Sequence, residues 1–169
     1  MTVRQIVMFP DPRLRAVAAP VTVFDGALKA LAGDLLDTLR AAQGLGITAP
    51  HIGIPARVVV IELAPADGVR TYVNPELTWT SDTMARHQEG SLSLPGVAEQ
   101  VERPDRVRVR FQDTDGAEHA AEADGLLAAC LQHEIDQLDG LFWIQRLSRL
   151  KRERLLKRHG KARRASLPD

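Results

Sequence analysis

The order of the predicted elements constrains the fold more than any other feature: strand-forming segments are grouped between helical ones. Apolar residues recur at helical spacing over 25–42, and Asp25 stands at the N-cap position of that run. A β-branched run predicts a strand at 57–63, and weaker signals predict further strands at 71–74, 76–84, 97–102 and 107–112. Helices are predicted over 125–138 and from 147 to about 158. Because strands and helices do not alternate, the sequence predicts an α+β fold.

Length and charge predict one domain with a basic end. The chain has 169 residues, enough for a single domain with a sizeable core. Its net charge of zero is uneven, since residues 1–145 carry 12 Lys/Arg against 20 Asp/Glu and residues 146–169 carry 10 against 2. We therefore expect a domain over 1–150 and a basic C-terminal helix or tail over 151–169, with Leu147, Leu150 and Leu155 on a short apolar stripe.

The sequence favours a cytoplasmic protein without a membrane contact. No N-terminal stretch has the pattern of a signal peptide, and no apolar run approaches the length of a membrane span. The single cysteine, Cys130, has no partner for an internal disulfide, which fits a reducing compartment.

One segment of the predicted helix at 125–138 carries recognisable chemistry. His133 and Glu134 begin a pattern in which a second histidine four residues on would bind a divalent metal with the first, while the glutamate acts as general base. Gln137 occupies the place of that second histidine. The segment therefore indicates metal-assisted hydrolysis that has been altered at the metal.

Three segments resemble, in order and spacing, the motifs of the peptide deformylase family. They are residues 44–51 (GLGITAPH), 89–93 (EGSLS) and 133–137 (HEIDQ), against family patterns G-x-G-x-A-A-P-Q, E-G-C-L-S and H-E-x-D-H. Further similarity at 9–15, 72–76 and 125–132 extends the resemblance over roughly residues 5–150. It implies short antiparallel sheets around the helix that carries His133, and removal of the N-formyl group from formyl-methionyl peptides.

The resemblance places two unsuitable side chains at metal-ligand positions. In the family, a cysteine and two histidines bind Fe²⁺, or in practice Zn²⁺ or Ni²⁺; the matching residues here are Ser91, His133 and Gln137. A serine hydroxyl is hard and neutral where a thiolate is soft and anionic, and a glutamine carbonyl is a weak ligand for late transition metals. We therefore expect no tightly bound metal, and standard deformylase activity that is lost or strongly reduced.

Other motif residues keep the roles that the resemblance implies. Glu134 matches the general base, and the backbone N–H of Leu92 matches a donor to the developing oxyanion. The remaining matches form the substrate site, with the last three lining a methionine side-chain pocket: Gly44, Gly46, Glu89, Gly90, Leu126, Ala129 and Cys130. Such a pocket predicts a formyl-methionyl or other N-acyl peptide as ligand.

His51 leaves two interpretations open. It replaces the motif glutamine that donates to the formyl oxygen, and neighbouring Thr48 replaces an alanine. His51 is either a pocket residue that drifted once the metal was gone or a new ligand, giving an active N-acyl amidohydrolase with a metal on His51 and His133 and Glu134 as base. A Ser91–His133 pair for acyl transfer is a third hypothesis.

The basic end suggests a second partner. Eight Lys/Arg lie between 151 and 164, and in several bacterial deformylases the C-terminal extension docks on the ribosome. By resemblance, ribosomal RNA is a possible contact; without an aromatic residue for base stacking, such binding would be electrostatic. A solvated helix with no partner is the alternative.

Overall fold

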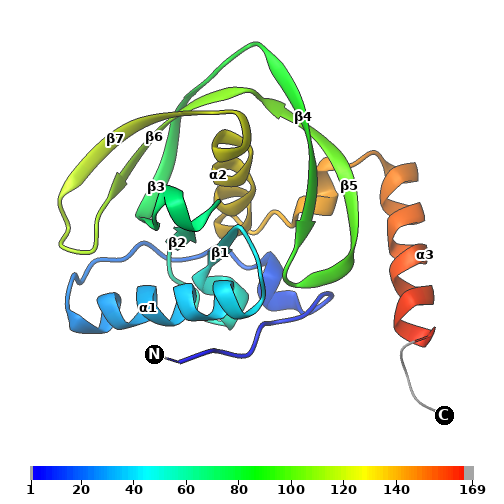
Figure 1. The fold of residues 1–169 in the computed structure, drawn as a ribbon, viewed down its shortest axis with the longest axis horizontal. Coiled ribbons are helices and arrows are strands. Elements are labelled where there is room, and N and C mark those ends of the chain that lie inside the picture. The colour runs from blue at the N-terminus through cyan, green and yellow to red at the C-terminus, as the bar shows by residue number, and fades with distance from the viewer. Residues whose placement is uncertain (1, 166–169) are drawn as a thin grey trace.

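A central helix lies between two antiparallel sheets in the computed structural model, which describes residues 2–165 (Figure 1). The helices are α1 (Gly26–Ala41), α2 (Gly125–Leu138) and α3 (Arg149–Ala165). One sheet has the order β1-β2-β3-β6-β7, formed by Gly46–Thr48, Val58–Ile61, Arg70–Thr80, Arg106–Gln112 and Glu118–Asp124. The other pairs β4 (Met84–Ser91) with β5 (Leu94–Pro104). The α+β class, with antiparallel sheets around α2, is confirmed.

Helix α2 is buried along most of its length. Its apolar residues Ala128, Leu131, Ile135 and Leu138 pack against the five-stranded sheet and form a core with residues of β2, β3, β6 and β7. The predicted bounds of this helix are confirmed at both ends. Since α2 is fixed by the sheet on one side, His133 and Asp136 reach the opposite sheet, where they contact Glu89 of β4 and Arg103 of β5.

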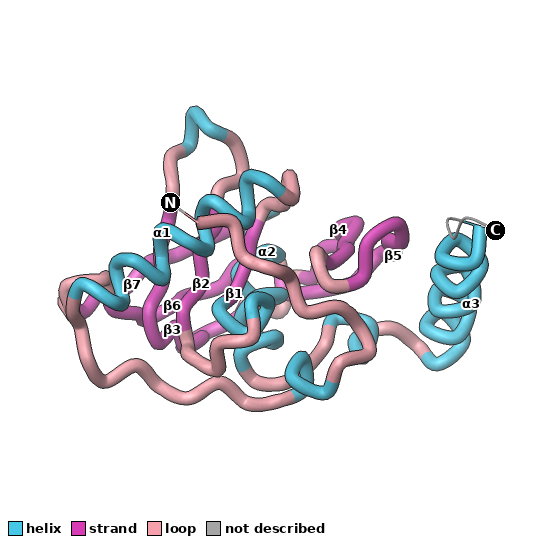
Figure 2. The backbone as a smooth tube through the Cα atoms, turned by 90° about the horizontal axis from the view of Figure 1, so that it is seen from below, coloured by secondary structure: helices cyan, strands magenta, loops and turns pink. Residues whose placement is uncertain are grey.

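Helix α1 covers the end of the five-stranded sheet at β1 and β2 (Figure 2). The Asp25 carboxylate accepts hydrogen bonds from the backbone N–H groups of Ala27 and Leu28, which confirms the predicted N-cap. Leu35 and Leu39 are fully buried against apolar residues of both strands. This packing fixes the C-terminal end of α1, from which the chain turns directly into β1.

Two strand predictions were wrong around Pro75 and Met84. The chain does not break at Pro75, because β3 runs through it and changes register between Val73 and Glu76. Asn74, with a φ of 50°, forms this irregularity, and its side chain bonds to the backbone of Val21. The register shift lets the proline sit in the strand without a ladder hydrogen bond. The strand predicted over 76–84 ends at Thr80, and Met84 begins β4.

Other differences concern β1 and β7, which the sequence did not indicate as strands. A turn at 113–116 joins β6 to β7, and there the Asp113 N–H donates to the carbonyl of Ala117. Among the helices that the structure describes, none has the length and apolar character needed to cross a membrane.

The C-terminal helix α3 is attached to the body through a small apolar contact. Leu155 is fully buried and Leu156 partly buried, against apolar residues of β5 and of the 3-10 turn Trp143–Arg146. Leu150, placed on the apolar stripe from sequence, is 55% exposed instead. The helix also begins later and ends later than predicted, so a boundary between 150 and 151 falls inside it.

Candidate active site

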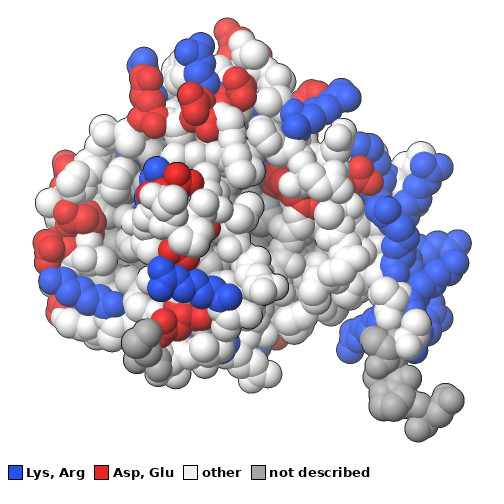
Figure 3. All heavy atoms as spheres, viewed as in Figure 1, with Lys and Arg blue, Asp and Glu red and all other residues white. Residues whose placement is uncertain are grey.

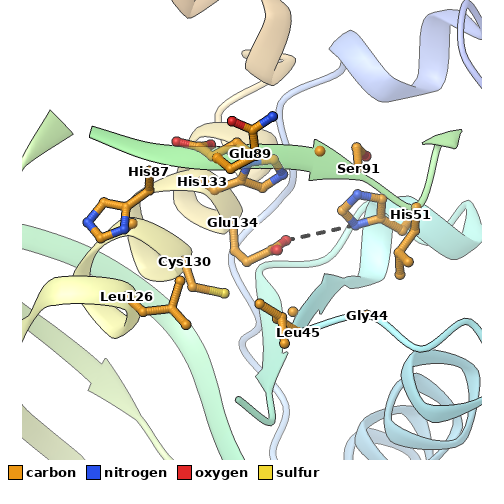
Figure 4. Close-up of a pocket in the computed structure, with 15 residues that line it drawn as sticks. Gly44, Leu45, His51, His87, Glu89, Ser91, Leu126, Cys130, His133 and Glu134 are labelled. Atoms are coloured by element: carbon orange, nitrogen blue, oxygen red, sulfur yellow. Dashed lines mark hydrogen bonds and ion pairs between the residues drawn. The ribbon is translucent and has the colours of Figure 1, made fainter. Parts of the chain in front are cut away.

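A pocket of about 240 Å³ opens between α2, β4 and the segment that enters β1 (Figure 4). It brings together every site residue expected from the sequence except Gln137: Gly44, Gly46, His51, Glu89, Gly90, Ser91, Leu92, Leu126, Ala129, Cys130, His133 and Glu134. Leu45, His87 and Gln88 complete the lining. Segments that are far apart in the sequence therefore form one concave site.

Periodicity explains how two elements supply most of the lining. On α2, Leu126, Ala129, Cys130 and His133 are spaced by three, four and seven residues and so share one helix face. The residues at 87, 89 and 91 alternate along β4 and share one face of the two-stranded sheet. The apolar part of the pocket therefore comes from the first half of α2, and the polar part lies where α2 approaches β4.

The two motif glycines are required for close packing against the pocket residues. A Cβ atom on Gly46 would lie 2.6 Å from Oε1 of Glu134 and 2.9 Å from the Cys130 sulfur. One on Gly44 would lie 2.9 Å from side-chain carbons of Leu39 and Leu92. The left-handed conformation at this turn belongs to Gln43, with a φ of 56°, and to neither glycine.

A buried network of charges supports the polar side of the pocket. Arg103 donates to both carboxylate oxygens of Glu89, at 2.6 and 2.9 Å, and to Asp136 at 2.8 Å. Nδ1 of His133 lies 2.7 Å from Oε1 of Glu89. Burial alone would raise the pKa of Glu89, but the hydrogen bonds from His133 and Arg103 lower it to about 2. Glu89 is therefore an anion that fixes the His133 ring.

His133 has its second nitrogen, Nε2, left for the pocket. Burial alone would lower the pKa of His133, but the hydrogen bond to Glu89 and the charge of Glu134 raise it above the ordinary value. A carboxylate on the far nitrogen of an imidazole is also the arrangement that orients metal-binding histidines. The geometry thus suits His133 equally as a cation or as a single oriented ligand.

Glu134 is buried next to His133 and faces the interior of the pocket. Its Oε2 atom has no hydrogen-bond partner among residues 2–165. Burial raises the pKa of Glu134 to about 7, although the charge of His133 opposes this. A carboxyl group of this kind gains or loses a proton near neutral pH, which is the property that a general base or acid needs.

His51 lies on the other side of Glu134 and is held by Thr48. The backbone N–H of Thr48 donates to Nδ1 of His51 at 3.0 Å, and the Thr48 hydroxyl lies 2.8 Å from the same nitrogen. Burial, together with the charge of His133, lowers the pKa of His51 to about 3. The ring is therefore neutral near pH 7. The 4.0 Å distance between Nδ1 of His51 and Oε2 of Glu134, dashed in Figure 4, is thus not an ion pair.

Comparison with known proteins identifies the family. A family model described as polypeptide deformylase matches residues 3–153. The chain belongs to this family. A peptide deformylase-like protein of Brucella melitensis is 65% identical over 97% of this chain and all of that protein.

Two solved structures share the fold closely. The peptide deformylase of Legionella pneumophila has a TM-score of 0.92 at 38% identity, covering 99% of this chain and 100% of that one. The deformylase of Synechococcus elongatus, solved in complex with actinonin, has a TM-score of 0.89 at 35% identity, covering 93% and 88%.

The residues at the deformylase ligand positions do not fit the family's metal. The Gln137 amide donates to the backbone carbonyl of Leu14 at 2.7 Å, and Gln137 is not among the residues that line the pocket. The Ser91 hydroxyl oxygen accepts a hydrogen bond from the N–H of Ser93 at 3.1 Å. Within residues 2–165, no group of three or more His, Cys, Asp or Glu side chains is placed to hold a metal ion. Only His133 keeps both a suitable donor atom and a position in the pocket.

Sequence reasoning missed one pocket residue of this deformylase homologue. His87 was not among the expected site residues, but it is half-buried and lines the pocket. The signal was available in its spacing, because His87 is two residues before Glu89 and a strand there would put both on one face. The run from 84 to 91 had not been recognised as a strand.

Proposed function

We propose that this deformylase homologue binds a formyl-methionyl or related N-acyl peptide, and that the family's metal-dependent hydrolysis is lost or strongly reduced. One observation carries the proposal: the motif residues line one pocket, while the Gln137 side chain at one ligand position bonds outside it and the Ser91 hydroxyl at another accepts a hydrogen bond from the Ser93 N–H. A pocket kept without its metal donors favours binding over hydrolysis.

The lining supports a peptide N-terminus as the ligand. Leu126, Ala129 and Cys130 offer an apolar wall for one side chain, and a volume of about 240 Å³ accommodates a methionine residue. The unpartnered Oε2 of Glu134 is an acceptor that an amide N–H would satisfy. The related Synechococcus deformylase holds actinonin, which supports a peptide-like ligand for this pocket as well.

Hydrolysis without the metal lacks its main source of activation. A bound metal in such enzymes lowers the pKa of water from 15.7 to about 7. Glu134 remains in place to take a proton, but the single positive charge of a protonated His133 activates an attacking water less than a divalent metal does. Catalysis by this chain alone should therefore be slow.

Formate release from formyl-Met-Ala-Ser tests the proposal. The protein is purified without oxygen and assayed with Fe²⁺ or Ni²⁺, with and without a chelator, while calorimetry measures peptide binding under the same conditions. Binding without turnover supports the proposal. Absence of binding by the folded protein contradicts the ligand assignment.

Chelator-sensitive turnover would instead support the rearranged metal site. The observation in its favour is that His51 and His133 both line the pocket. The hydrogen bond from the Thr48 N–H to Nδ1 of His51 counts against it, because a neutral ring then carries its proton on Nε2, and a metal would have to displace that proton. In that case His51→Ala should abolish turnover together with metal content. Turnover that resists the chelator and disappears in Ser91→Ala would support the acyl-transfer hypothesis.

The basic helix α3 supports the further proposal of a polyanionic partner, such as ribosomal RNA. Figure 3 shows blue side chains gathered over α3 at one side of the molecule. Five of its cations, with Glu99 of β5, line a groove between the helix and the body: Lys151, Arg154, Lys157, Arg158 and Lys161. Such a surface binds phosphates electrostatically and loses affinity steeply with salt.

The test must leave the core intact. Removing residues 151–169 would expose the core, because Leu155 is fully buried. A triple variant, Arg154→Gln, Lys157→Gln and Lys161→Gln, removes charge from the groove alone. It should reduce low-salt co-sedimentation with ribosomes, whereas Arg70→Gln/Arg106→Gln, on the five-stranded sheet, should not. Equal co-sedimentation of all proteins would contradict the proposal.

A further inference from the structure

Two departures from the deformylase pattern lie within one motif and contact each other. Thr48 stands where the motif has alanine, and His51 stands where it has glutamine. In the structure, the Thr48 hydroxyl is 2.8 Å from Nδ1 of His51, and both residues are almost completely buried. An alanine at 48 would offer the backbone N–H but not the hydroxyl. The two replacements therefore form one structural unit.

This contact determines which imidazole nitrogen carries the proton. The backbone N–H of Thr48 is a donor only, and it points at Nδ1 at 3.0 Å. Nδ1 must then present its lone pair, and in a neutral ring the hydrogen is on Nε2. A hydroxyl that donates to the same lone pair strengthens this tautomer and limits rotation of the ring.

Nε2 is the nitrogen that remains for a ligand. Within residues 2–165 it has no hydrogen-bond partner, whereas Nδ1 lies 4.0 Å from Oε2 of Glu134, and the His51 ring lines the pocket (Figure 4). A glutamine at 51 would present an amide N–H, and the Nε2–H of a fixed imidazole is a donor of comparable strength. Donor function at this position is therefore preserved by a different chemical group.

We propose that Thr48 is a positioning residue that fixes the tautomer and orientation of His51, so that the Nε2–H of His51 donates to the carbonyl oxygen of the bound ligand. The ligand assignment rests on the proposed function, whereas the tautomer does not. Thr48 itself does not touch the ligand in this arrangement.

NMR of the free protein tests the tautomer without any ligand. With ¹⁵N-labelled histidine, and with His51→Gln used to assign the signals, the wild-type His51 ring should show a protonated Nε2 and an unprotonated Nδ1. Thr48→Val keeps the side-chain volume and removes the hydroxyl, so the Nδ1 resonance should shift. A protonated Nδ1 in the wild type, or an Nδ1 resonance unchanged in Thr48→Val, would overturn the proposal.

Peptide binding tests the consequence for the ligand. For formyl-Met-Ala-Ser, Thr48→Val should weaken affinity by roughly 2- to 10-fold, the effect of one hydrogen bond, while Thr48→Ser, which keeps the hydroxyl, should stay within about 2-fold. In a His51→Gln background, Thr48→Val should have no such effect, because there is no tautomer to fix. Equal losses in both backgrounds, or a loss in Thr48→Ser as large as in Thr48→Val, would assign Thr48 to packing alone.

The NMR experiment and the peptide-binding experiment can be contradicted independently of each other. If no variant binds the peptide, the proposed function is wrong, and the NMR result still decides whether Thr48 sets the His51 tautomer.

Discussion

Replacing Glu89 by glutamine should destabilise the protein in a way that depends on pH. Glu89 is 8% exposed and bonds to Arg103 and His133. Its pKa is about 2 in the folded protein against an ordinary 4.5. Because the folded value is the lower one, the ionised carboxylate stabilises the fold above about pH 4.5, and this stability is lost as the pH falls toward 2.

The size of the effect follows from the two pKa values. The difference corresponds to roughly 3 kcal/mol at pH 7, at about 1.4 kcal/mol per pKa unit. By pH 3 the contribution falls to about 1.5 kcal/mol, since the unfolded carboxyl is then protonated and the folded one mostly is not. Glutamine resembles the protonated carboxyl, so the stability gap between wild type and Glu89→Gln should narrow by about half over this range.

Urea unfolding, followed by tryptophan fluorescence, measures the stability gap between wild type and Glu89→Gln at pH 7 and at pH 3, because Trp143 is buried in the core. The matched control is Glu102→Gln, which removes an exposed ion pair with Arg86 in the same two-stranded sheet. Its cost should be within about 0.5 kcal/mol of zero at every pH. A Glu89→Gln gap that is constant from pH 7 to pH 3, or no larger than that of the control, would refute this account of the network.

Three further predictions concern the pocket. Gly46→Ala should lower the free energy of unfolding by about 1–3 kcal/mol, because the added Cβ would meet Glu134 and Cys130. The control is Gly33→Ala in α1, where an added Cβ has no atom within 4 Å and the change should be neutral or stabilising. Thermal melts compare the two variants, and equal effects would contradict the close-packing role of Gly46. Burial raises the pKa of the Cys130 thiol well above its ordinary value, so iodoacetamide at pH 8 should modify the folded protein more than about 10-fold slower than the urea-unfolded chain; similar rates would show an accessible thiolate. Ser91→Cys combined with Gln137→His should retain stoichiometric Zn²⁺ after dialysis, as measured by elemental analysis, where wild type and either single variant do not; a wild type that retains as much metal as the double variant would show that the present donors suffice.

Elements with strong local signals were predictable, and those that depend on pairing were not. Helix α1 carries its own cap, and the β-branched run of β2 has no competing interpretation. Strand β7 reads Glu118–Asp124 with three alanines and no apolar alternation. Alanine and glutamate favour helix, so this strand forms because β6 offers a paired edge across a tight turn. That information is not local to the segment.

The site, like the fold, has features that the local sequence predicts and features that depend on distant contacts. The motifs located nearly all of the pocket lining, because their spacing places residues on one face of α2 and one face of β4. The sequence did not show which way a side chain turns. Gln137 is on the predicted helix at the predicted position, yet its amide bonds to Leu14, 123 residues away in the chain. A contact with such a distant backbone carbonyl has no trace in the local pattern.

The departures from the family pattern are of two physical kinds, and the difference bears on whether the pocket still has a use. Ser91 and Gln137 replace metal donors: the Ser91 hydroxyl accepts from the Ser93 N–H, and the Gln137 amide bonds outside the pocket. Thr48 and His51 instead contact each other, and His51 lines the pocket. A pocket that had lost its function could lose the metal donors by random substitution. Random substitution would not be expected to give two buried polar side chains that hydrogen-bond to each other, since a buried polar group without a partner costs stability. The joint replacement at 48 and 51 therefore favours a pocket that still binds a ligand over a pocket left without function.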